Sequence, residues 1–227
     1  MFDAVAYVKS TSLSIKPIAD FLYNEISKCA YKFDCKIDKH QKWIVYHEIV
    51  TFSFNFYHLI LRYRLPDNEN ALTEAYKCYI LAATQCLKKI RKPLFSTLPK
   101  TFDFLRQRST DYDCAYWDEK FPSQHLLAFL TDNEIERILE QPLNTGLAFF
   151  CECVACVLVN KRHDAVNYQK EALSYIITDI FESARISALA YSVYSIMEVY
   201  LSTMLTRHLP DPSDQEQLYI PPHFTNT

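Results

Sequence analysis

Residues 39–64 read KHQKWIVYHEIVTFSFNFYHLILRYR, an apolar stretch that contains neither proline nor glycine. Its few polar side chains recur at helical spacing, which predicts a largely buried helix. Asp38 stands directly before the stretch as a typical N-cap, and Pro66 follows it as a helix breaker. We therefore expect a helix from about Lys39 to Arg64, with the rest of the fold packed around it.

The same 3.6-residue apolar period continues on both sides of this helix. Ser14 and Pro17 suit the first turn of an earlier helix that runs to about Phe33. Further helices are expected at about residues 69–91, 99–107, 131–140, 147–159 and 164–208, the last with a break near residues 178–183. The sequence thus predicts an all-α fold, a single helical bundle of about seven or eight helices over residues 1–208. Residues 209–227 are rich in proline and are expected to form an extended or disordered tail.

Glycine is almost absent, since the 227 residues include one glycine, Gly146. A P-loop, a dinucleotide-binding fingerprint and a glycine-flanked nucleophile elbow each need two or more glycines at fixed spacing. These classes of site are therefore excluded. Pro142, Asn144 and Gly146 make the clearest break in the helical pattern, and we expect Gly146 to form a corner between two packed helices.

Charge and cysteine content narrow the function classes further. The formal net charge of −3 argues against a nucleic-acid binder that relies on bulk positive charge. The beginning of the chain does not resemble a secretion signal, and eight cysteines in a chain of this length favour free thiols in the cytoplasm over a disulfide framework. Residues 186–206 lack lysine and arginine but contain Glu198 and several serines and tyrosines, which favours a buried helix over a membrane span.

A polar stripe runs along one face of the helix expected at residues 39–64. Its members are spaced three, four or seven residues apart, beginning at His40 and continuing through His47, Thr51, Asn55, His58 and Arg62. The favoured interpretation is the solvent-exposed edge of a mostly buried helix. The alternative is a polar seam that faces a cleft or a partner. A metal site is disfavoured because Glu48 and the histidines lack the HExxH spacing.

Other chemistry-bearing residues fit roles in the core. Glu152 and Glu198 are single carboxylates in apolar segments, and each is expected to meet a histidine, an arginine or a tyrosine because a buried carboxylate must be paired or protonated. Cys151, Cys153 and Cys156 are expected to be core thiols because no second CxxC pair completes a zinc site. The sequence therefore predicts no metal and no cofactor.

One connector combines aromatic and acidic residues, as protein-binding surfaces do. The candidates for contact with a partner protein are Asp111, Tyr112, Asp113, Tyr116, Trp117, Asp118 and Glu119. The alternative interpretation is that this connector packs over the bundle.

Three function classes remain open. The favoured one is a non-catalytic cytoplasmic protein-binding module, of which an immunity- or antitoxin-like inhibitor of a partner enzyme is one form. The second is a helical enzyme with a site of dispersed His, Glu and Tyr side chains, such as a metal-dependent hydrolase in which His47 and His58 face Glu152 or Glu198. The third is a membrane-associated subunit. The favoured class involves another protein as partner, with neither nucleic acid nor membrane.

Overall fold

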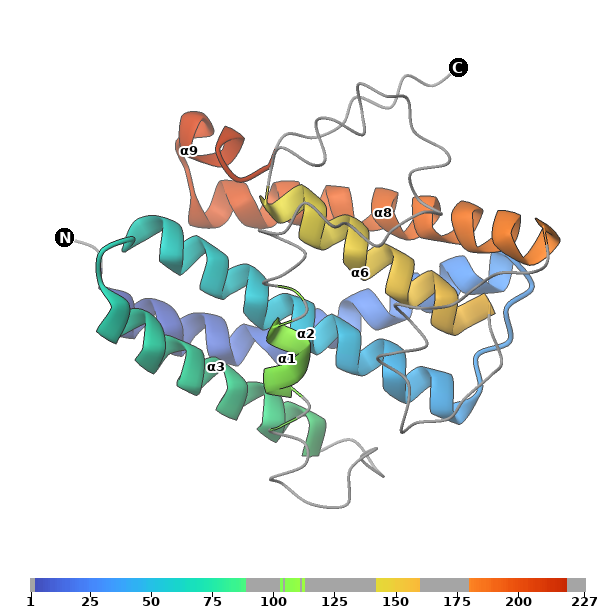
Figure 1. The fold of residues 1–227 in the computed structure, drawn as a ribbon, viewed down its shortest axis with the longest axis horizontal. Coiled ribbons are helices and arrows are strands. Elements are labelled where there is room, and N and C mark those ends of the chain that lie inside the picture. Colours follow the sequence, from blue (N-terminus) through green and yellow to red (C-terminus); the bar gives the residue numbers. More distant parts are fainter. Residues whose placement is uncertain are drawn as a thin grey trace.

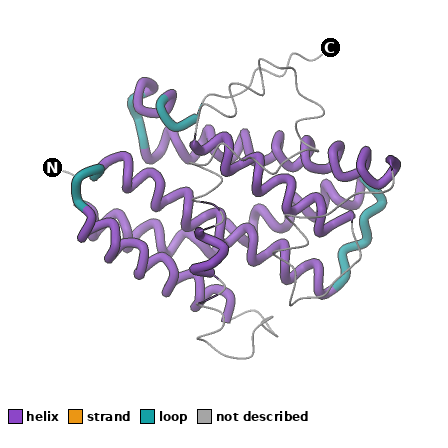
Figure 2. The backbone as a smooth tube through the Cα atoms, in the orientation of Figure 1, coloured by secondary structure: helices purple, strands orange, loops and turns teal. Residues whose placement is uncertain are grey.

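The computed structural model describes residues 3–88, 103, 105–110, 112, 142–159 and 180–219. Within these ranges the fold is all-α, without strands, which confirms the predicted fold class (Figures 1 and 2). The helices are α1 (Ala4–Lys32), α2 (Lys39–Arg64), α3 (Glu69–Lys88), α6 (Pro142–Val159), α8 (Ile180–His208) and α9 (Pro212–Glu216). A further helical segment, residues 105–110 and 112, is named the covering segment below.

Helix α2 lies at the centre of the bundle (Figure 1). Short loops join α1 to α2 and α2 to α3, so α1 and α3 run in the same direction beside each other and both pack on α2. Helix α6 packs on α2 from another side, and α8 lies against α6 and α1. This position explains why α2 is apolar around most of its circumference.

The two ends of α2 follow the sequence prediction because local capping chemistry fixes them. The Gln41 N–H donates to the Asp38 carboxylate at 2.8 Å, and the Asp38 N–H donates to the Gln41 amide oxygen at 3.0 Å, a reciprocal capping box. At the start of α3, the Ala71 N–H donates to the Asn68 side chain at 3.1 Å. Residues 65–68, which include Pro66, separate the two helices.

Helix α1 begins earlier than the sequence predicts. Asp3 is its N-cap and accepts a hydrogen bond from the Ala6 N–H at 3.0 Å. Pro17 consequently lies inside the helix and not in its first turn. Proline removes one backbone hydrogen bond, but the buried residues Ile15 and Ala19 anchor the helix on both sides of it.

The expected corner at Gly146 is wrong. Helix α6 begins at Pro142, so Asn144 and Gly146 lie within its first turns. Proline is well suited to the first helical position, where its missing N–H has no intrahelical acceptor. Gly146 is buried in α6, and no glycine among the described residues has a positive φ. A positive φ of 54° occurs instead at Asp34, in the loop between α1 and α2.

The first part of the predicted tail is folded. Residues 212–216 form α9, and Leu218 and Tyr219 are buried. The Tyr63 hydroxyl donates to Asp214 at 2.9 Å, and the Leu143 N–H donates to the Leu218 carbonyl at 3.2 Å. The expectation of an extended or disordered tail is therefore wrong for residues 212–216, while residues 220–227 lie outside the described part.

The C-terminal long helix is described from Ile180, and it continues without interruption to His208. The break expected near residues 178–183 stays a prediction, because the residues before Ile180 lie outside the described part. Residues 178 and 179 lie outside the described ranges, as does the helix expected at 131–140. Searching the described helices for a bilayer-length apolar span finds none, residues 186–206 included.

Candidate functional site

The polar stripe of α2 points mostly into the protein. His47, Thr51 and Asn55 are buried, so the expected solvent-exposed edge is wrong for these three residues. His58 and Arg62, toward the end of the helix, are half-buried. The side chain of His40 lies outside the described part. The physical reason for the burial is the covering segment, which places polar partners over this face of α2.

A buried ion pair forms the centre of this contact. The Arg108 Nε donates to Glu48 Oε1 at 2.8 Å and the Arg108 Nη2 donates to Glu48 Oε2 at 3.0 Å, with both side chains 0% exposed. The Tyr112 hydroxyl adds a hydrogen bond to Glu48 Oε2 at 3.1 Å. The guanidinium carbon lies 5.6 Å from the Tyr112 ring centroid and 4.8 Å from that of Phe149, a cation–π arrangement.

Neutral hydrogen bonds extend the cluster along α2. The Ser109 hydroxyl donates to Asn55 Oδ1 at 2.7 Å, and the Asn55 amide donates to the Thr51 carbonyl at 2.9 Å. On the α6 side, the Arg108 Nη2 donates a hydrogen bond to the Cys153 sulfur at 3.0 Å. The covering segment is thus tied to both α2 and α6 by the buried side chains of Arg108, Ser109 and Tyr112.

The chemistry of this cluster is that of a structural contact. The Glu48 oxygens accept hydrogen bonds from Arg108 and Tyr112. Burial raises the pKa of the Cys153 thiol to about 12, although the nearby Arg108 charge acts in the opposite direction. The reactive form of a cysteine is the thiolate, so Cys153 is held in its unreactive form at neutral pH.

The predicted partner-binding connector is described at one residue. Tyr112 is fully buried and bonded to Glu48, so its assignment to an exposed partner surface is wrong. The reason is that its ring packs against Phe149, with centroids 5.1 Å apart, and against Phe52. The remaining candidates lie outside the described residues: Asp111, Asp113, Tyr116, Trp117, Asp118 and Glu119.

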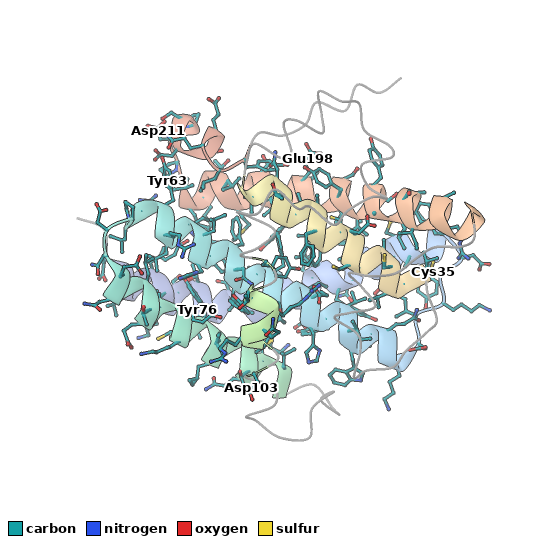
Figure 3. All side chains as sticks on the ribbon, in the orientation of Figure 1. Cys35, Tyr63, Tyr76, Asp103, Glu198 and Asp211 are labelled. Atoms are coloured by element: carbon teal, nitrogen blue, oxygen red, sulfur yellow. The ribbon has the colours of Figure 1, made fainter. Side chains whose placement is uncertain are left out.

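The isolated carboxylates and the cysteine cluster occupy the core. Glu152 is buried and Glu198 is half-buried on α8 (Figure 3). Burial raises the pKa of Glu198, and its charge acts on the neighbouring tyrosines Tyr194 and Tyr219. The expected core position of the thiols is confirmed, since three cysteines of α6 are buried: Cys151, Cys153 and Cys156. The described residues contain no group of three His, Cys, Asp or Glu side chains positioned to hold a metal ion.

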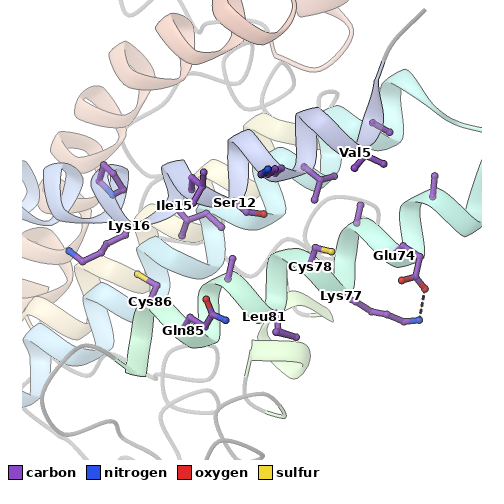
Figure 4. A pocket seen from close by; sticks show the side chains of 18 residues that line it. Val5, Ser12, Ile15, Lys16, Glu74, Lys77, Cys78, Leu81, Gln85 and Cys86 are labelled. Carbon is purple, nitrogen blue, oxygen red and sulfur yellow. Dashed lines mark hydrogen bonds and ion pairs between the residues drawn. The ribbon is translucent and has the colours of Figure 1, made fainter.

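A second candidate site is a groove of about 860 Å³ between α1 and α3 (Figure 4). Its lining is mainly apolar, with Val8, Ile15 and Ala75 among the buried lining residues. Larger side chains line it while remaining exposed to solvent: Val5 at 80%, Leu13 at 73% and Leu81 at 54%. Contiguous exposed apolar surface of this kind marks interaction sites in soluble proteins.

Charged side chains lie along the same groove. Lys9, Lys16 and Lys77 line it together with one acidic residue, Glu74. Lys77 pairs with Glu74 at 2.7 Å, and Lys16 pairs with Asp20 on α1. An exposed thiol, Cys78, also lines the groove.

Sequence reasoning missed this groove because it placed the start of α1 too late. With the helix beginning at Ala4, Val5 and Leu13 are apolar residues outside the buried face of α1, which includes Val8, Thr11 and Ile15. That surplus of apolar side chains is the signal in the sequence that points to a second packing face.

Comparison with family models, curated proteins and solved structures found no match to this chain.

Proposed function

We propose that this chain is a non-catalytic protein-binding module and that the groove between α1 and α3 is its binding site. The observation that carries the proposal is the exposure of Val5, Leu13 and Leu81 around a groove of about 860 Å³. No disulfide joins one described cysteine to another, which is compatible with the reducing cytoplasm expected from the sequence. The narrower expectation of an immunity- or antitoxin-like inhibitor stays a prediction.

The shape of the groove favours a helical segment of the partner. A pair of parallel helices presents two ridges with a trough between them, the geometry in which an amphipathic helix is bound by its apolar face. A helix is about 10 Å wide with its side chains and therefore covers both ridges. A thin ligand that occupied only the floor would leave Leu13 and Leu81 exposed. A helix that covers both walls removes from water the apolar surface that is solvated in the free protein.

The enzyme alternative receives less support. Glu48 and Arg108 are satisfied by each other inside the core, and neither is exposed to a substrate. The half-buried His58 contacts the Tyr76 ring, with centroids 5.4 Å apart. Protein binding through the groove therefore accounts better for the exposed features of the described residues.

The test uses a model peptide that forms an amphipathic helix with leucines on one face and equal numbers of Glu and Lys on the other. Fluorescence anisotropy of the labelled peptide is expected to show saturable binding to the wild-type protein. The double variant Leu13→Glu and Leu81→Glu is expected to lose that binding, because a charge on each ridge of the groove must then be desolvated.

The matched control is Val199→Glu, which places the same charge at a 71%-exposed valine on α8, outside the groove lining. It is expected to bind the peptide as the wild type does. All variants should keep the wild-type helical circular dichroism, because the substituted side chains are exposed. Absence of binding to the wild type, or equal binding by the double variant, refutes the assignment of the groove.

A further inference from the structure

The charges that line the groove differ in sign from the protein as a whole. The chain has a formal net charge of −3. The groove lining, in contrast, contains three lysines and one glutamate. A binding surface is commonly complementary in charge to its partner, which steers encounter and fixes the register of the bound segment.

The spacing of two of these lysines sets a register for the bound helix. Lys9 and Lys16 are seven residues apart on α1, which places them about 10 Å apart along its axis at a helical rise of 1.5 Å per residue. Lys16 already pairs with Asp20, whereas Lys9 makes no ion pair with a described residue. On the other wall, Lys77 pairs with Glu74 near the Val5 end of the groove (Figure 4).

We propose, on the basis of the proposed function, that the partner segment is an acidic amphipathic helix. Its apolar face packs between Leu13 and Leu81. Carboxylates seven residues apart on its flank meet Lys9 and Lys16, and a carboxylate on the other flank meets Lys77. The groove would therefore select a partner helix that carries negative charges beside an apolar stripe.

Two other occupants fit the charge distribution less well. A second copy of the chain bound groove to groove places the lysine-rich linings opposite each other, and like charges in opposition are unfavourable. The chain's own residues 220–227, IPPHFTNT, contain no acidic residue to pair with the lysines. An acidic partner helix satisfies both the apolar and the charged parts of the groove.

The experiment compares two peptides of about 14 residues, which at the same helical rise match the stretch of α1 from Ala4 to Pro17 that lines the groove. Both carry the same leucine face, and their flanks contain Glu in one and Lys in the other. At about 50 mM salt the wild-type protein is expected to bind the Glu peptide about tenfold more tightly, because Lys9 gains a carboxylate partner and Lys16 and Lys77 each gain a second one, whereas the Lys peptide brings like charges to all three. The preference should shrink at about 0.5 M salt, where screening shortens the range of the charges.

A charge-reversal variant locates the effect. The double variant Lys9→Glu and Lys16→Glu is expected to reverse the preference between the two peptides. The matched control, Lys36→Glu and Lys39→Glu, makes the same change in net charge at exposed lysines outside the groove lining. It is expected to retain the wild-type preference.

The outcomes separate this inference from the function on which it rests. Equal affinity for the two peptides overturns the acidic specificity and leaves the groove as a protein-binding site. Failure of the wild type to bind either peptide overturns both. A concentration-dependent dimer that the Glu peptide dissociates assigns the groove to a second copy of the chain, and displacement of the peptide by oleate assigns it to a lipid; each of these results also overturns the proposal.

Discussion

The buried ion pair between Glu48 and Arg108 makes a sharp prediction about stability. The substitution Glu48→Gln keeps the size and planarity of the side chain but removes the charge that compensates the guanidinium. Arg108 donates to Glu48 at 2.8 and 3.0 Å, and both side chains are fully buried. The variant therefore leaves the guanidinium in the core, beside the rings of Tyr112 and Phe149, without the carboxylate to which it donates.

The expected loss follows from the burial. Removing one partner of a buried pair costs about 3–5 kcal/mol, because the remaining charge stays desolvated. A typical domain is stable by about 5–15 kcal/mol, so the loss is a large fraction of the whole. With a urea m-value of about 3 kcal/mol/M, the midpoint of unfolding should fall by about 1–1.7 M.

The assay is urea unfolding of a double-mutant cycle monitored by circular dichroism. Arg108→Met alone is expected to be similarly costly, because it leaves the Glu48 carboxylate buried without its cation. The double variant is expected to lose less than the sum of the single losses, since neither charge is then stranded. The exposed pair of Glu74 and Lys77, at 2.7 Å, is the matched comparison; Glu74→Gln should change the free energy of unfolding by about 0.5 kcal/mol or less.

Two results would refute this reasoning. One is a Glu48→Gln protein within about 0.5 kcal/mol of the wild type, which would equate a buried pair with an exposed one. The other is strict additivity in the cycle, which would mean that Glu48 and Arg108 do not interact energetically.

Three further predictions follow from other described residues. The Gln41 amide donates to the Val157 and Leu158 carbonyls at 2.8 and 3.2 Å at the end of α6. Gln41→Ala should lower the free energy of unfolding by about 1–3 kcal/mol, because it removes the donor to these buried carbonyls. Thermal unfolding measures the loss, and an unchanged Tm would contradict it. Burial lowers the pKa of His47 to about 4, below the value of about 6.5 expected in the unfolded chain. Between about pH 4 and 6.5 the unfolded chain therefore binds more protons than the folded protein, so stability should be lost as the pH falls through this range. His47→Gln should reduce that loss by up to about 3 kcal/mol, measured by urea unfolding at several pH values. An equally steep pH profile in the variant would rule out that role. Cys78 is the one exposed thiol among the described cysteines. In a protein with Cys114→Ser, which removes the one cysteine outside the described residues, a single thiol should react fast with a disulfide reagent. The Cys78→Ser, Cys114→Ser double variant should show no fast-reacting thiol. Fast reaction of a further thiol in the folded double variant would contradict the burial of the others.

Local signals in the sequence predict some elements well. The bounds of α2 follow from Asp38 and Gln41 at its start and from the Pro66 turn after its end, all of which act within a few residues. The start of α1 was misplaced because Pro17 resembles a first-turn proline, whereas Asp3 provides the actual cap. At Gly146, tertiary burial within α6 outweighs the low helix propensity of glycine.

The candidate sites depend on contacts between distant residues. The periodicity of α2 correctly placed His47, Thr51 and Asn55 on one face, but it did not show which element covers that face. The answer is the covering segment, in which Arg108 is 60 positions from Glu48 along the chain. The groove likewise requires α1 and α3 to lie side by side, which no local pattern specifies.

The arrangement of α1 and α3 separates the positions that stabilise the bundle from those that line the groove. On α3, Tyr79 and Ile80 are buried in the core, while Leu81 is exposed on the groove. Substitutions at exposed positions usually change stability by less than about 0.5 kcal/mol. On the proposed function, the choice of partner is therefore free to diverge at Val5, Leu13 and Leu81 while the bundle beneath stays intact, so this chain could acquire a new partner without first acquiring extra stability.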